Sequence, residues 1–176
     1  MKKYFLIAAL MLMLNGLAVA GEPENGTKGQ PTAKAPVPHC QVPCGIYADQ
    51  MRFEMMLEDT RTIEKAIVSL NEYADKFNQA PPTGKDLNQV SRWVSTKESH
   101  ASNTQKIIAD YFLAQRIKES NKDYSSQLIT AHKVIVAAMK CKQDANPMTA
   151  AALKKAILDL YRAYEGKEPN FNHSEK

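Results

Sequence analysis

The chain has 176 residues, of which 24% are charged and 44% apolar, and its formal net charge is +4. This length suits one ordinary domain. The mean hydropathy of −0.43 excludes a protein with several membrane spans, and the apolar fraction is too high for a wholly disordered chain. Charged residues form no long block of one sign, so we expect no nucleic-acid binding. Three cysteines are too few for a small scaffold held by disulfides.

Residues 1–20 have the pattern of a secretory signal peptide. Met1-Lys2-Lys3 is basic, an apolar run follows over residues 4–14, and Ala18-Val19-Ala20 supplies the small residues that a signal peptidase accepts. The apolar run is shorter than the roughly 20 residues of a membrane-spanning helix. We therefore expect Sec-type export to the periplasm or the exterior, with no membrane attachment once the signal is removed.

Residues 21–38 are rich in Gly, Pro and Thr and show no hydrophobic period. Such a segment cannot bury a core of its own, and it is predicted to be a flexible pro-segment. The folded domain is then expected over residues 39–176.

Four helical stretches are predicted in this domain. They run over about residues 49–77, 86–118, 124–141 and 147–164. In the first stretch, apolar residues recur at spacings of three and four, as in an amphipathic helix. Val90, Trp93 and Val94 are assigned to the apolar face of the second stretch, and Ile129 and Met139 to that of the third. No run alternates with a period of two, so strands are not expected. Short connections between long helices favour an all-α fold, an up-down antiparallel four-helix bundle.

The ends of these stretches carry ordinary helix signals. Pro81 and Pro82 interrupt the chain after the first stretch, Asn146 and Pro147 predict the start of the fourth, and Gly166 predicts its end. The second stretch has an unusually polar middle over residues 95–104. This part predicts either a bend or a face that meets something other than an ordinary core.

The segment His39-Cys40-Gln41-Val42-Pro43-Cys44-Gly45-Ile46-Tyr47 carries the candidate chemistry. Two cysteines four residues apart, with Pro and Gly beside them, indicate a tight turn. Thiolates and an imidazole together favour a transition metal over Mg²⁺ or Ca²⁺. In an exported protein, the same spacing also suits a disulfide between Cys40 and Cys44, and the residues alone do not decide between the two. A haem-attachment motif and a second cysteine pair are both absent from the sequence.

The motif His-Cys-x-x-Pro-Cys-Gly-x-Tyr resembles the nickel hook of the nickel-containing superoxide dismutases, with an N-terminal hook loop ahead of four helices. Residues 88–93, 97–101 and 109–118 also resemble the second helix of that family. The resemblance covers residues 39 to about 166. It implies an oxidoreductase that converts superoxide to O₂ and H₂O₂ by cycling its nickel ion between Ni(II) and Ni(III).

The resemblance also implies a set of metal ligands. These are the α-amine and imidazole of His39, the backbone nitrogen and sulfur of Cys40, and the sulfur of Cys44. The α-amine is free only after a maturation protease cuts the Pro38–His39 bond. The family is hexameric, so a homohexamer is expected.

Further roles follow from the resemblance, residue by residue. Tyr47 would line the approach to the metal and act with His39 in catalysis. Pro43 would shape the hook. Gln41 replaces an aspartate that is common in the family, which removes a negative charge near the entrance.

Three residues within the helices also correspond to positions of the family. Glu54 would hydrogen-bond the His39 imidazole, or be a solvated helix carboxylate. Tyr111 would support the site, or be a core tyrosine. His100 falls where some members have an arginine near the hook of an adjoining subunit, or is a surface histidine.

Two other functions remain open at this stage. One is a non-enzymatic exported metal-binding helical protein, and the other is an inert bundle with a Cys40–Cys44 disulfide. Among the remaining residues, Cys141 is expected to be a lone structural thiol, and His132 and His173 are expected at the surface. The methionines Met51, Met55 and Met56 are expected to fill the core or an interface.

Overall fold

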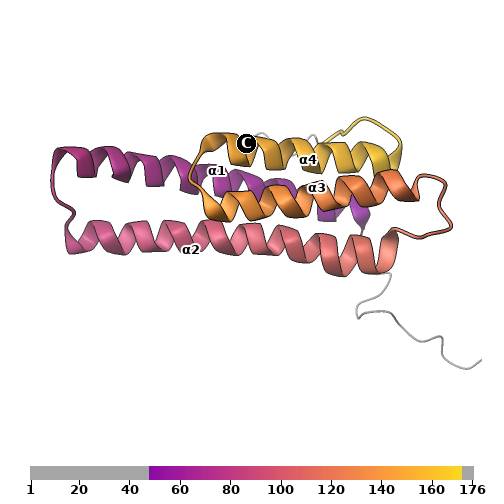
Figure 1. Ribbon diagram of the computed structural model, residues 1–176, viewed down its shortest axis with the longest axis horizontal. Helices are drawn as coiled ribbons and strands as arrows, with labels where there is room; N and C mark the ends of the chain where they lie inside the picture. The colour runs from indigo at the N-terminus through magenta and orange to yellow at the C-terminus, as the bar shows by residue number, and fades with distance from the viewer. Residues whose placement is uncertain (1–47, 172–176) are drawn as a thin grey trace, which may run out of the picture. The chain divides into compact units, whose positions relative to one another are not determined.

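The computed structural model describes residues 48–171, and Figure 1 shows their arrangement. The elements are α1 (Asp49–Gln79), α2 (Gly84–Lys106), the π-helix η1 (Ile107–Arg116), α3 (Tyr124–Gln143) and α4 (Pro147–Glu165). The hook motif, the predicted signal peptide and the predicted pro-segment lie outside the described residues.

The all-α, up-down four-helix arrangement is confirmed. Helix α1 packs against α2 and α4, and α3 packs against the same two neighbours, so chain neighbours are also neighbours in space (Figure 1). Short connections force successive helices to run antiparallel. Among residues 48–171, no helix is both long and apolar enough to cross a membrane.

The core is built from the apolar stripes that the sequence predicts. On α1, Phe53, Met56, Ile63 and Ile67 are almost completely buried, at the spacings that place them on one face of a helix. Aromatic rings close the end of the bundle at which α1 begins. The Phe53 ring centroid lies 4.8 Å from that of Phe112 and 5.0 Å from that of Tyr161, which are favourable ring–ring separations.

The start and end of α4 follow their sequence signals. The Asn146 side chain accepts a hydrogen bond from the backbone N–H of Met148 at 2.9 Å, and Pro147 occupies the first turn. Gly166 ends the helix with φ of 68°, a left-handed conformation that glycine adopts at little steric cost.

The second predicted helix differs from the structure in two ways. It begins at Gly84 rather than Asp86, because Thr83 and Asp86 form a capping box that satisfies two backbone N–H groups. From Ile107 the helix continues as a π-helix and ends at Arg116, not Lys118. The backbone N–H of Ile117 donates to the carbonyl of Phe112 at 2.8 Å, the five-residue spacing of a π-helix.

The polar middle of α2 faces the bundle and is satisfied by hydrogen bonds. Lys97, Ala101 and Thr104 are buried there, at helical spacing. The Lys97 ammonium donates to the carbonyls of Cys141 and Lys142, at the end of α3. A face that meets a polar partner, rather than a bend, therefore explains this stretch.

Three apolar residues assigned to the buried face of α2 are not in the core. Val94 is 40% exposed, and Val90 and Trp93 are only half-buried. They belong to a part of α2 that has α1 beside it but no other helix to cover it. On α3, Ile129 and Met139 are likewise exposed although they fit the apolar pattern.

Candidate metal centre

The predicted site residues His39, Cys40, Gln41, Pro43, Cys44 and Tyr47 lie outside the described residues. The structure does describe the end of the bundle that follows them in the chain, starting at Ala48. It also places Glu54, His100 and Tyr111.

A carboxylate clamp fixes the first residue of α1. Asp49 accepts hydrogen bonds from the Tyr111 hydroxyl on η1, from the Tyr164 hydroxyl on α4 at 2.8 Å, and from the Arg116 guanidinium at 2.6 Å. Arg116 also forms an ion pair with the same carboxylate. The start of α1, two residues after Tyr47, is therefore tied to the ends of two other elements.

The clamp changes the acidity of its members. Burial alone would raise the pKa of Asp49, but the hydrogen bonds from Arg116, Tyr111 and Tyr164 outweigh it and lower that pKa overall. Burial, together with the neighbouring Asp49 carboxylate, raises the pKa of Tyr111 and that of Tyr164 to about 12. Both phenols therefore stay protonated, as donors to an ionised Asp49, over the ordinary pH range.

The π-helix explains how η1 supplies two of the three donors. Tyr111 and Arg116 are five residues apart, and an α-helix would direct such side chains about 140° apart at its 3.6 residues per turn. Hydrogen bonds between residues five apart widen the turn, so the two side chains point to the same carboxylate. π-Helical turns occur frequently at functional sites.

Two guanidinium groups lie against the Tyr111 ring. The Arg52 and Arg116 guanidinium carbons are 5.4 Å and 5.7 Å from the ring centroid, within the range of a cation–π contact. Tyr111 is thus 7% exposed and has polar and cationic partners, in addition to its edge-on contact with Phe112. It is a core residue of the bundle and also part of the clamp.

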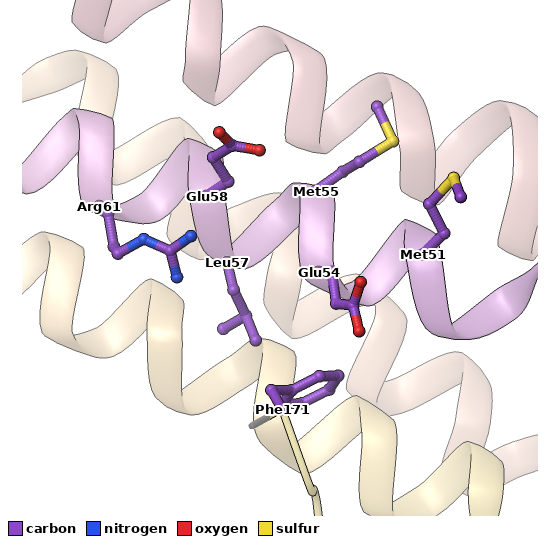
Figure 2. A pocket seen from close by; sticks show the side chains of 7 residues that line it. All are labelled: Met51, Glu54, Met55, Leu57, Glu58, Arg61 and Phe171. Carbon is purple, nitrogen blue, oxygen red and sulfur yellow. The ribbon is translucent and has the colours of Figure 1, made fainter. Parts of the chain in front are cut away.

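Glu54 lines a pocket on the opposite side of the first turns of α1. The pocket has a volume of about 340 Å³ and is lined by Met51, Glu54, Met55, Leu57, Glu58, Arg61 and Phe171 (Figure 2). In Figure 2, the side chains of Glu54 and Leu57 point toward the Phe171 ring. The Glu54 carboxylate accepts a hydrogen bond from Gln50 at 3.0 Å, so it is an oriented carboxylate with open space beside it.

The predicted role of the methionines is only partly confirmed. Met56 is fully buried, but Met51 is 54% exposed and lines the Glu54 pocket together with Met55. Phe171, which follows α4, closes one side of the pocket and packs edge-on against Tyr161.

His100 is paired with a buried carboxylate. Its Nδ1 lies 2.7 Å from Oδ1 of Asp59 on α1, and the His100 side chain remains 37% exposed. The other Asp59 oxygen accepts hydrogen bonds from Asn103 at 2.7 Å and from Thr104 at 3.3 Å. An ionised carboxylate only accepts, so Nδ1 donates and the ring orientation is fixed.

Glu54, His100 and Tyr111 therefore occupy three separate settings in one chain: a pocket, a carboxylate pair and the clamp. Sequence reasoning missed Asp49, Arg116 and Tyr164. The only local signal at Asp49 is an acidic residue in the first turn of a helix, which many helices share.

Residues 48–171 contain no cluster of three or more His, Cys, Asp or Glu side chains that could hold a metal ion. Cys141, the one cysteine within that range, is buried and free, as predicted for a structural thiol, and burial raises its pKa. His132 is exposed, as predicted. The predicted donors His39, Cys40 and Cys44 comprise the imidazole and thiolates that suit nickel.

Comparison with known protein families identifies the family of the chain. No curated protein and no solved structure gives a significant match. The family model described as nickel-containing superoxide dismutase matches residues 31–168, which include the motif and all four helices. The chain therefore belongs to the nickel-containing superoxide dismutase family and is an oxidoreductase that uses nickel to convert superoxide to O₂ and H₂O₂.

Proposed function

We propose that the nickel ion of this dismutase is held by the chain's own hook, after cleavage before His39. The ligands are the α-amine and imidazole of His39, the backbone nitrogen and thiolate of Cys40, and the thiolate of Cys44. One observation carries the proposal: the motif lies inside the matched residues 31–168 and ends directly before the clamped start of α1.

The chemistry of these donors suits the reaction. The amine and imidazole of His39, the backbone nitrogen of Cys40 and the two thiolates would hold the metal, and nitrogen and thiolate donors of this kind suit nickel. When bound, nickel supplies the Ni(III)/Ni(II) couple that accepts an electron from one superoxide and returns it to a second, which takes up two protons. The protein supplies the donors, their orientation and control of access.

The Asp49 clamp supports this role by its place in the chain. Asp49 follows Cys44 by five positions in the chain, so a fully extended chain holds their Cα atoms at most about 18 Å apart. A fixed Asp49 therefore restricts where the last thiolate ligand lies relative to the bundle. A freely fraying first turn would not impose this restriction.

We assign supporting roles to further residues. Tyr47 orders water and limits access to the metal, Pro43 shapes the hook, and Gln41 leaves the entrance without the usual carboxylate. Such neighbouring contacts hold ligands in one orientation and tune a metal.

Three residues of the helices are proposed to assist the hook. Glu54 hydrogen-bonds the imidazole of His39, and the space beside its carboxylate is compatible with that role. Tyr111 acts through Asp49. His100 presents its free ring nitrogen to the hook of an adjoining subunit, in a homohexamer.

The proposed maturation has two cuts. A signal peptidase removes residues 1–20 on export, and a second protease cuts Pro38–His39 and frees the α-amine. Mass spectrometry of the native protein tests both cuts, the nickel content and the subunit number together. We expect a chain that starts at His39 with one nickel per chain, and an active protein that starts at Gly21 would contradict the proposed amine ligand.

A pair of cysteine variants tests the ligand set. Cys44→Ser should lose nickel, the electron paramagnetic resonance signal of Ni(III) and dismutase activity while keeping its helicity. Cys141→Ala is the matched control, since Cys141 is buried within the bundle, and it should keep nickel and activity. Normal activity in Cys44→Ser would remove Cys44 from the site.

A further inference from the structure

Residues 72–96 form an arm that projects beyond the four-helix core. The arm consists of the last turns of α1, the first turns of α2 and the loop between them, and Figure 1 shows both helices extending past the ends of α3 and α4. Its base is marked by two contacts. Asn71 donates to the carbonyl of Ala145 at 3.1 Å, and Lys97 donates to the last carbonyls of α3.

The arm has a defined fold of its own. Asp86 accepts hydrogen bonds from Lys76 at 2.6 Å and from the Thr83 hydroxyl at 2.7 Å, which joins α1 to the capping box of α2. The hydrogen bonds from Lys76 and Thr83 lower the pKa of Asp86 to about 2. The carboxylate is therefore ionised at neutral pH and holds the two helices together.

This arm leaves apolar surface exposed. Asp86 is the single buried residue between 72 and 96, whereas Leu87 is 54% exposed and Val94 is 40% exposed. Tyr73 and Trp93 are only half-buried. Two helices alone cannot enclose an apolar core, so these side chains lack the cover that α3 and α4 give to the rest of the bundle.

A groove runs along the arm between α1 and α2. It has a volume of about 500 Å³ and is lined by Ser69, Glu72, Tyr73, Lys76, Thr83, Lys85, Asp86 and Trp93. A smaller hollow of about 110 Å³ is lined by Gln89, Arg92, Trp93 and Thr96 of α2. Aromatic rings bordered by charged groups are typical of a surface that binds another protein.

The charges of the arm are separated by helix. Apart from the Lys76–Asp86 pair, α1 contributes Glu72 and Asp75, and α2 contributes Lys85 and Arg92. None of these four forms an ion pair with any residue in the range 48–171. One helix thus presents unpaired acidic groups and the other unpaired basic groups.

We propose that the arm is a docking surface for the arm of a second copy of this chain. A two-fold contact places the same patch on both subunits, so α1 of each arm meets α2 of the other. That pairing brings the acidic residues of one copy to the basic residues of the second. It also forms a four-helix contact that covers Trp93 and its apolar neighbours.

The inference goes beyond the nickel chemistry and holds independently of the hexamer. If six chains assemble through other surfaces and leave the arm exposed, the hexamer proposal stands and the arm contact is wrong.

Trp93 is the single tryptophan of the chain, so its fluorescence reports on the arm directly. We expect the fluorescence emission of Trp93 to shift to shorter wavelength as the protein concentration rises. Sedimentation measures the association that accompanies this shift. A monomer with solvated Trp93 at all concentrations would overturn the proposal. Emission that is already blue-shifted in the monomer would also overturn it, because another segment of the same chain would then cover the arm.

A charge exchange tests the predicted partner chemistry. Glu72→Arg and Arg92→Glu each place like charges across the contact, and each change occurs twice in a two-fold interface. We expect each variant to self-associate about tenfold more weakly, from the usual strength of exposed ion pairs. The Glu72→Arg variant has only basic groups at positions 72 and 92, and the Arg92→Glu variant has only acidic groups there. A mixture of the two variants should therefore form a heterodimer in preference to either homodimer.

Matched controls use exposed residues away from the arm. Glu119→Lys and Lys154→Glu change charge equally but should leave association unchanged. The buried apolar core lies outside the arm. The circular dichroism spectrum and the thermal unfolding temperature should therefore remain close to those of the wild type in all variants. Mixing that fails to produce the heterodimer would exclude the proposed pairing of α1 with α2.

Discussion

The Tyr164 hydroxyl lies 2.8 Å from Oδ2 of Asp49 and joins the last helix to the first residue of the first helix. With Tyr111 and Arg116, it makes Asp49 the meeting point of α1, η1 and α4. This residue is also where the proposed nickel hook joins the bundle. In the proposed site, one carboxylate therefore couples stability at this point to geometry at the metal.

Replacing Asp49 with Asn should weaken both. The amide carries no charge for Arg116 and accepts fewer hydrogen bonds, so unfolding in urea should show a loss of about 1–3 kcal/mol, the usual cost of disrupting hydrogen bonds to a charged group. The nickel signal and activity per bound nickel should also change, because the hook is less well anchored.

Asp110→Asn is the matched control on η1. Asp110 forms an exposed ion pair with Lys106 four residues earlier, and such pairs contribute about 0.3–0.5 kcal/mol. If the Asp49 and Asp110 variants lose equal stability and keep the same nickel spectrum, the clamp has no special role.

The two clamp tyrosines should titrate late. Because the pKa of Tyr111 and of Tyr164 is raised to about 12, the fold favours their neutral form. Their contribution to stability is complete below the unfolded pKa of about 10 and is lost as the pH rises through about 12. Phenolate absorbance should show a late component that decreases in Tyr111→Phe and in Tyr164→Phe. The assignment would be wrong if each substitution removed only phenolate absorbance that appears near the ordinary tyrosine pKa of about 10.

The sequence was enough to predict the four helices and their connections. Spacings of three and four on α1, and the cap residues Asn146 and Gly166, are local signals that need no knowledge of the rest of the fold. The family resemblance is likewise local, because nine consecutive residues, 39–47, carry most of it.

Other features depend on contacts that are distant in the chain. The partners of Asp49 lie 62, 67 and 115 residues away, so no local pattern marks this aspartate as a clamp. The apolar side chains in the range 107–117 fit an α-helix as well as a π-helix, so hydrophobic periodicity does not reveal the change of helix type. Periodicity also assigned Trp93 and Val94 to a buried face, because it cannot tell that the neighbouring helices end before reaching them.

Lys97 provides a test of the polar interior of α2. Its side chain is 4% exposed, and it donates to two carbonyls at the end of α3 that lack partners within the helix. Lys97→Met keeps the volume but removes the donor and the positive charge from the negative end of the helix dipole. We expect a loss of about 1–3 kcal/mol in urea unfolding.

Lys140→Met in the same last turn of α3 serves as the control for Lys97. Lys140 is exposed, so its substitution should change stability by less than about 0.5 kcal/mol. An equal or greater stability of Lys97→Met would mean that the cost of burying the ammonium exceeds the gain from capping α3.

His100 tests whether the nickel site extends to a second subunit. Asp59 fixes the ring through Nδ1, which leaves Nε2 for another partner on the exposed side. If that partner belongs to a neighbouring hook, His100→Gln should lower kcat and change the electron paramagnetic resonance spectrum of the oxidised nickel. Asp59→Asn should produce part of the same spectral change, because it releases the ring without removing it.

Asn103→Ala is the control, since it removes a hydrogen bond of 2.7 Å to the other Asp59 oxygen but leaves the imidazole in place. It should reduce stability while leaving kcat and the spectrum unchanged. An unaltered spectrum and kcat in His100→Gln would restrict His100 to joining α1 and α2 within its own bundle.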